Sequence, residues 1–152
     1  MKDNQRQELL EIYKLHAELA DRVSQRREGA NKLYASLLTG ILIFLAAFLR
    51  YGTGIIPVWL LLIVTGVLGS LFSVSWFIVI RSYRQLNTIK FEVLHKLEEK
   101  LAYTFFKREW NLLEKGENKG RYRKLTVVET GLPIIFSFLF LALIVIAFCK
   151  FN

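Results

Sequence analysis

The chain has 152 residues, of which 53% are apolar, 14% aromatic and 22% charged. This length leaves no room for a second independent globular domain beside its long apolar runs, and the composition is not that of a soluble core. The net charge of +8 is compatible with anionic lipid, with nucleic acid or with an acidic partner. A single cysteine, Cys149, excludes an intrachain disulfide and a thiolate metal site.

Residues 1–32 predict a cytoplasmic amphipathic helix. Between residues 6 and 31 the apolar and half-apolar positions recur in steps of three and four, at Leu9, Ile12, Tyr13, His16, Leu19, Ala20, Val23 and Arg27. We expect this helix to continue directly into the first apolar run. Its stripe then needs a partner, which is another helix of this chain or a neighbouring copy.

Three runs without a charged side chain, 33–49, 55–80 and 132–149, have the length that crosses a bilayer as a helix. We assign transmembrane helices to 33–50, 55–80 and 132–149, and a short outer tail to 150–152. Pro57 and Pro133 are expected in the first turns of the second and third helices, where a missing N–H costs little. The expected fold class is an all-α membrane protein, with three transmembrane helices and long cytoplasmic helical extensions that form a homo-oligomeric ring.

The distribution of Lys and Arg predicts the orientation. These residues gather in 1–32 and 81–131, which the positive-inside rule places in the cytoplasm, with the C-terminus outside. The anionic lipid of the inner leaflet is the expected lipid partner of these basic segments. Tyr34, Trp76 and Tyr83 suit an aromatic belt at the inner face.

The second transmembrane run carries two pairs of small residues four apart. These pairs, Gly66 with Ser70 and Gly69 with Ser73, allow two helix backbones to approach closely. The sequence leaves open whether this packing lies within one subunit or between subunits.

Residues 81–131 form a basic cytoplasmic segment. A helix is expected over Arg81–Ala102, and its apolar stripe is predicted to pack on the stripe of 9–23 through Leu86, Ile89, Val93, Leu97 and Leu101. Glu92, Glu98 and Glu99 are expected on the solvated face. A short amphipathic piece at 105–113 packs on that helix pair or lies at the membrane surface, and Lys115–Gly120 reads as a turn.

Polar residues gather near the predicted inner face of the membrane. They form a candidate cytoplasmic collar, which is a solvated rim, a subunit interface, a gate or a docking surface for an anionic ligand. Its principal members are Arg27, Asn31, Arg84, Asn87, Arg121, Tyr122, Thr126 and Glu129, with Arg26, Arg81, Gln85 and Arg123 beside them.

No catalytic constellation can be assembled, so the expectation is a protein that is not an enzyme and has no cofactor or metal. His16 and His95 lie on or near apolar helix stripes, which favours a packing role over that of a ligand or base. The predicted spans contain no ionisable side chain, which argues against a proton- or ion-coupled transporter.

Several of these stretches carry a family resemblance. Their order and placement relative to the spans resemble the RipA-type octameric inner-membrane proteins of bacteria, a group similar to the small membrane accessory protein of type VI-B CRISPR systems. The resemblance covers most of residues 13–135, and the stretches are Glu18-Leu-Ala-Asp-Arg-Val-Ser-Gln-Arg-Arg27, Ala30-Asn31-x-x-Tyr34, Ser82-Tyr-Arg-Gln-Leu-Asn87, Lys90-Phe91, Leu97-Glu98, Glu109-Trp110 and Tyr122-x-x-Leu125-Thr126-x-x-Glu129-x-x-x-Pro133.

The resemblance implies a homo-octamer in the bacterial cytoplasmic membrane. For the CRISPR relative it implies a pore that disturbs the membrane potential, and for the RipA branch a role in stress or host adaptation. A nuclease-like pair of Arg and His four to six residues apart has been discussed for that relative. Here the nearest such pairs, Arg6 with His16 and Arg84 with His95, are about ten residues apart. No catalytic residue is therefore carried over.

Three hypotheses follow for the function. The first is a homo-oligomeric, possibly octameric, membrane ring with a gated pore that serves a stress response or defence. The second is a membrane scaffold that recruits a soluble cytoplasmic partner through 81–131. The third is a membrane-tethered sensor of nucleic acid or nucleotide, for which salt-dependent binding would be the sign.

Overall fold

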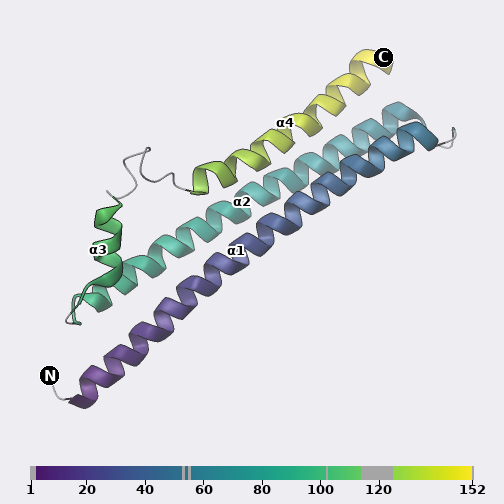
Figure 1. Cartoon of the computed structure of the whole chain (residues 1–152). Helices are drawn as coiled ribbons and strands as arrows, with labels where there is room; N and C mark the ends of the chain where they lie inside the picture. Colours follow the sequence, from purple (N-terminus) through teal and green to yellow (C-terminus); the bar gives the residue numbers. More distant parts are fainter. Residues whose placement is uncertain (1–2, 53, 55, 102, 114–124, 152) are drawn as a thin grey trace. The chain divides into compact units, whose positions relative to one another are not determined.

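The computed structural model describes residues 3–52, 54, 56–101, 103–113 and 125–151. These residues form four helices, α1 (Asp3–Tyr51), α2 (Val58–Glu98), α3 (Phe105–Leu112) and α4 (Leu125–Phe151), and the described part of the chain contains no strand (Figure 1). Helices α1, α2 and α4 are each long and apolar enough to cross a membrane. The predicted all-α class with three membrane-spanning helices is confirmed.

Helix α1 is a single helix of 49 residues that joins the charged N-terminal segment to the first apolar run. At ~1.5 Å per residue it is about 74 Å long, more than twice the ~30 Å hydrocarbon core of a bilayer. Gly29 does not interrupt it, and a Cβ at that residue would meet nothing within 4 Å. The expected continuation of the N-terminal helix into the first span is confirmed.

The connection between α1 and α2 is short. After Tyr51, the N–H of Gly52 donates to the carbonyl of Phe48 (2.7 Å), and a Cβ at Gly52 would collide with that carbonyl. Gly54 has φ +48°, a left-handed conformation that glycine adopts without strain.

Of the two proline placements, that of Pro133 was wrong. Pro57 stands just before the first residue of α2, where its carbonyl accepts the N–H of Leu61 (3.1 Å). Pro133 lies inside α4, because that helix begins already at Leu125. The predicted helix began with the apolar run at residue 132. The polar residues before this run are also helical, so α4 begins earlier than predicted.

Contacts among the described residues divide the chain into two compact units. The aqueous unit comprises residues 1–28 and 82–127, and the membrane unit comprises residues 29–81 and 128–152. Helices α1 and α2 each contribute to both units, α3 belongs to the aqueous unit, and α4 lies almost wholly in the membrane unit.

The membrane unit packs three helices on one another. One cluster joins Leu38 of α1, Trp76 and Ile80 of α2 and Phe140 of α4, all of them fully buried. A second cluster joins Leu45, Leu62 and Ala147 from the same three helices. Because lipid tails are as apolar as these side chains, close van der Waals packing rather than water exclusion holds such helices together.

In the aqueous unit, α1 buries Ala20 and Val23, whereas α2 buries Leu94 and Glu98. For Leu86 and Ile89 the predicted packing on α1 was therefore wrong, since these two side chains remain 43% and 58% exposed, whereas Val93, Leu97 and Leu101 are half-buried. Residues advance by about 100° per position on a helix, so Leu86 and Ile89 point well away from Leu94 and Glu98. Helix α2 also ends at Glu98, before the predicted end at Ala102.

Candidate functional site

The most constrained polar group of the aqueous unit is the carboxylate of Glu98, which is 0% exposed. Its Oε1 accepts the hydroxyl of Tyr13 (2.9 Å) and the backbone N–H of Phe106 (2.7 Å), and its Oε2 accepts the backbone N–H of Lys107 (3.0 Å). The expectation that Glu98 lies on a solvated face was wrong. One carboxylate ties together α1, α2 and α3.

Glu98 acts as the cap of α3. The first N–H groups of a helix lack partners within that helix and carry partial positive charge, so a carboxylate there is favourable. Thr104, at the N-cap position, makes no side-chain cap bond. The Glu98 carboxylate, from the last residue of α2, accepts these N–H groups in place of the Thr104 side chain. Between α2 and α3 the chain makes a turn in which the N–H of Leu101 donates to the Glu98 carbonyl (3.0 Å).

Tyr13 lies between this carboxylate and an aromatic cluster. Its ring centroid is 6.4 Å from that of Phe106, which in turn meets Phe91 edge-to-face at 5.8 Å. Burial, the hydrogen bond to Glu98 and the negative charge of Glu98 raise the pKa of Tyr13 to about 12. The phenol is therefore held protonated, as a donor.

The neighbouring carboxylate, Glu99, makes a contrasting contact. It pairs with the Lys107 ammonium at 2.7 Å on an exposed surface, and that hydrogen bond lowers the pKa of Glu99. Exposed pairs of this kind contribute little to stability because solvent screens them. Two adjacent residues, Glu98 at the end of α2 and Glu99 just after it, thus form a buried cap and a surface ion pair.

The small residues of the second span pack inside the subunit. A Cβ at Gly66 would lie 2.9 Å from the carbonyl of Phe140, and a Cβ at Gly69 would overlap the ring of Phe140. Ser73 is buried and donates to the carbonyl of Gly69 (2.8 Å), while Ser70 is half-buried. Gly66 and Gly69 therefore let α4 approach α2. For these two residues, the close packing lies within one subunit.

A polar ladder joins α1 to α2 within the membrane unit. The Trp76 Nε1–H donates to Asn31 Oδ1 (2.9 Å), and the hydroxyls of Tyr34 and Ser75 share a hydrogen bond of 3.2 Å. The rings of Tyr34 and Trp76 stack with centroids 6.0 Å apart. Trp76 is fully buried, so the expectation that it belongs to an interfacial belt was wrong.

The predicted collar divides between the two units. Arg27, Arg84 and Asn87 belong to the aqueous unit, and Asn31 and Glu129 to the membrane unit. Arg27, Asn87 and Glu129 are half-buried and Arg84 is exposed. Arg121, Arg123 and Tyr122, like the predicted turn at 115–120, lie outside the described residues, as does the side chain of Thr126. The collar as one assembly stays a prediction.

The histidines lie apart from any ligand set. His16 Nδ1–H donates to the carbonyl of Ile12 in its own helix (3.0 Å), and His95 is half-buried on α2. Within the ranges that the structure describes, no group of three His, Cys, Asp or Glu side chains is arranged to hold a metal ion.

Sequence reasoning missed Glu98 as a structural residue. A signal was present, because Leu94 and Glu98 are four apart and so share a helix face with Asn87 and Phe91. The stripe through Leu86 and Ile89 contains more apolar residues, so apolar periodicity predicts that stripe as the packing face of the helix. The predicted packing residues Val93 and Leu97 are half-buried at the edge of the true contact.

Helices α1, α2 and α4 are each able to cross a membrane, and two glycines of α2 let α4 pack closely against it. The chain is therefore a helical integral membrane protein. The chain matches the octameric membrane protein family over residues 10–149, and it belongs to that family. It is therefore a membrane protein that associates with copies of itself. No curated protein and no solved structure matches the chain.

Proposed function

We propose that eight copies of this chain form a ring in the bacterial cytoplasmic membrane and that the ring encloses a gated pore used in a stress response or in defence. The proposal makes the protein a non-enzymatic one. Family membership supports the self-association. The resemblance to the CRISPR accessory protein supports the pore, and the positive-inside rule supports a cytoplasmic N-terminus and an outer C-terminus.

The observation that carries the pore is the polarity of α1 within the membrane unit. Its exposed span residues include Ser36, Thr39 and Gly40. By contrast, every exposed side chain on α2 from Val58 to Ile78 and on α4 from Leu132 to Phe148 is apolar. Bulky apolar faces suit lipid, whereas hydroxyl-bearing and small residues suit a water-filled lumen. Helix α1 is therefore the lining helix in this proposal.

The same face of α1 carries a candidate gate. Ser36, Gly40, Ile43 and Ala47 recur in steps of four and three, so they share one side of the helix. Ile43 is 64% exposed in a single copy. A ring of eight isoleucines at one level would form a hydrophobic constriction, which closes a narrow pore by expelling water.

The test uses two isoleucines of nearly equal exposure. Ile43→Thr changes the proposed constriction, whereas Ile135→Thr changes a residue of α4 that is 61% exposed. In liposomes loaded with a small fluorescent dye, we expect Ile43→Thr to raise release severalfold over the unmodified protein. Ile135→Thr should leave release unchanged.

Two outcomes would reject the pore. The first is equal, low release from all three proteins when mass measurements show eight-chain particles in the same samples. The second is a rise in release for Ile135→Thr that matches that of Ile43→Thr. A stable soluble partner captured together with a non-conducting ring would instead favour a scaffold that acts through residues 81–131.

A further inference from the structure

Two apolar surfaces are exposed among the described residues of the aqueous unit, and they lie on opposite sides of it. The first, here called the open face, lies on α1 and α2. Its most exposed members are Ile12, Leu15, Leu86 and Ile89, at 39%, 54%, 43% and 58% exposure. Leu19, Val93 and Leu97 are half-buried within it.

Helix periodicity puts Ile12, Leu19, Leu86 and Leu97 on one side of the α1–α2 pair, and Ile89 lies on the outer edge of this surface, away from α1. At about 100° per residue, Ile12 and Leu19 lie roughly a quarter turn from the buried Ala20 and on the same side of it as the buried Val23. On α2, Leu86 and Leu97 lie roughly a quarter turn from the line through Leu94 and Glu98. Because the two helices run in opposite directions, both rotations turn toward the same side of the pair.

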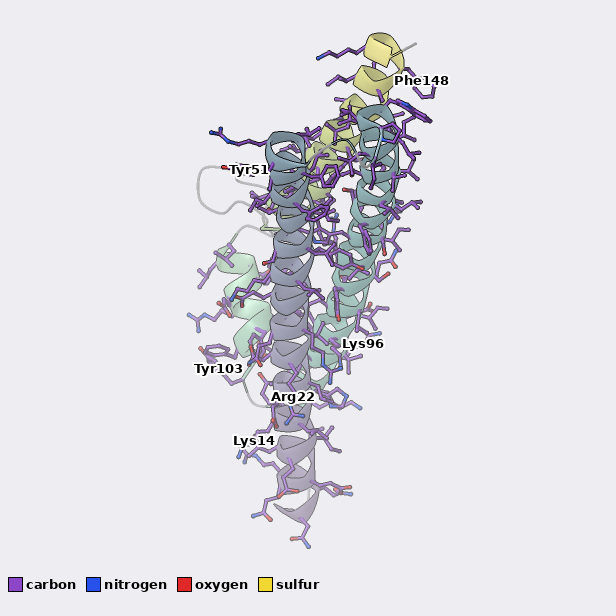
Figure 2. The ribbon with its side chains drawn as sticks, turned by 90° about the vertical axis from the view of Figure 1, so that its right-hand side faces the viewer. Lys14, Arg22, Tyr51, Lys96, Tyr103 and Phe148 are labelled. Atoms are coloured by element: carbon purple, nitrogen blue, oxygen red, sulfur yellow. The ribbon has the colours of Figure 1, made fainter. Side chains whose placement is uncertain are left out.

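Helix α3 occupies the other side. Its Phe106 meets Tyr13 and Phe91, which lie on the opposite edges of the two buried lines. Figure 2 shows Tyr103, just before α3, on the same side of α1 as Lys14. The open face and α3 therefore lie on opposite sides of the aqueous unit.

The second surface, here called the α3 patch, is an exposed part of α3 and of the segment just before it, and it borders Phe106, whose ring meets that of Phe105 edge-to-face at 5.5 Å. It consists of Tyr103, Phe105 and Leu112, which are 60%, 56% and 67% exposed. Arg108 stands among them and donates to the Tyr103 hydroxyl (3.5 Å). Exposed aromatic and leucine side chains around an arginine are typical of a contact surface between proteins.

We propose that the α3 patch of one copy docks on the open face of the next copy. The occupant is a second copy because the chain belongs to a family of octamers. Two different surfaces on opposite sides make a head-to-tail contact, which repeats from copy to copy and forms a ring when the rotation between copies closes, whereas an open face paired with itself would stop at two copies.

Charge agrees with this pairing. Glu8 and Glu11 border Ile12 and Leu15 on the exposed side of α1, whereas Glu18 is already paired with Arg22 at 2.8 Å. Arg108 of the α3 patch is the cation that would meet this acidic border. The contact belongs to the aqueous unit, and it holds whether or not the ring conducts.

The test is cross-linking of full-length protein in native membranes. Cys149 is first replaced, as Cys149→Ser, so that no native thiol remains. The double variant Leu112→Cys with Ile89→Cys is then treated with a bifunctional maleimide, whose reach relaxes the need for an exact register. We expect a ladder of covalent products that extends to eight chains.

The controls decide the geometry of the contact. Each single-cysteine variant should give no ladder, and Leu112→Cys with Thr88→Cys should give none either, because Thr88 is exposed but lies off the open face. Dimers from Ile89→Cys alone would show that open faces pair with themselves and would overturn the proposal. An intact eight-chain particle without a ladder from the double variant would also overturn it.

A second measurement does not depend on cross-linking chemistry. Ile89→Glu and Leu112→Glu each place a charge on a side chain that is exposed in a single copy, so helicity should be retained. We expect both variants to lose the multi-chain particle in a mass measurement, whereas Thr88→Glu should keep it. Retention of the particle by both variants would place the contact elsewhere.

Discussion

Replacing Glu98 by glutamine should loosen α3 from the aqueous unit while α1 and α2 stay paired. The carboxylate accepts three hydrogen bonds, from the Tyr13 hydroxyl and from the backbone N–H groups of Phe106 and Lys107. A glutamine amide offers one acceptor oxygen and one donor group. At least one N–H of α3 would then face another donor.

The magnitude follows from these contacts. An unmatched buried donor costs ~1–3 kcal/mol, and the remaining bonds weaken by about 1 kcal/mol in total when their acceptor loses its charge. The local opening free energy of α3 should fall by about 2–4 kcal/mol. At about 1.4 kcal/mol for each factor of ten, amide exchange should accelerate roughly 30- to 900-fold.

The assay is hydrogen–deuterium exchange read out on peptides that cover 105–112. Glu99→Gln is the matched control, since it changes the residue directly after Glu98 but removes only the exposed contact with Lys107. Its effect on exchange should be small because solvent screens that pair. Equal acceleration by both variants, or none by Glu98→Gln, would refute the reasoning.

Three further predictions rest on single contacts. Because the pKa of Tyr13 is raised from 10.0 to about 12, its contribution to stability is complete below pH 10 and is lost between pH 10 and 12; Tyr13→Phe should flatten that part of a pH-dependent unfolding curve. Gly69→Ala should destabilise the membrane unit by ~1–3 kcal/mol through overpacking. Gly40→Ala, with nothing within 4 Å of its Cβ, should instead stabilise the unit by about 0.5–1 kcal/mol. The measurement is thermal unfolding in detergent, and a shift of both variants in the same direction would contradict this prediction. Asn31→Ala leaves the Trp76 Nε1–H unmatched and should cost ~1–3 kcal/mol by the same assay, while no change would mean that another acceptor serves the indole.

The spans were predictable because their signal is one of length and composition. An uncharged apolar run of about 20 residues has few fates other than a membrane helix. The continuity of α1 was predictable for a similar reason, since neither a proline nor a strong helix stop interrupts the periodic pattern from Leu9 onward.

The face of α2 that packs on α1 was not predictable from apolar periodicity. Burial of Glu98 depends on α3, whose first N–H groups need a cap, and on the Tyr13 hydroxyl far away in the sequence. Such contacts are long-range, so a pattern along one helix cannot reveal them. The same limit hid the partner of Trp76, because an aromatic residue near a helix end also fits an interfacial belt.

The three tryptophans stand in three different surroundings. Trp76 is wholly enclosed and stacked on Tyr34, whereas Trp59 near the start of α2 and Trp110 on α3 keep 45% and 38% of their surface open. Indole emission depends on contact with water, so the protein carries its own optical probes. Replacing Trp59 and Trp110 by phenylalanine would leave a single emitter shielded from dissolved quenchers, and loosening of the bundle could then be followed by light alone.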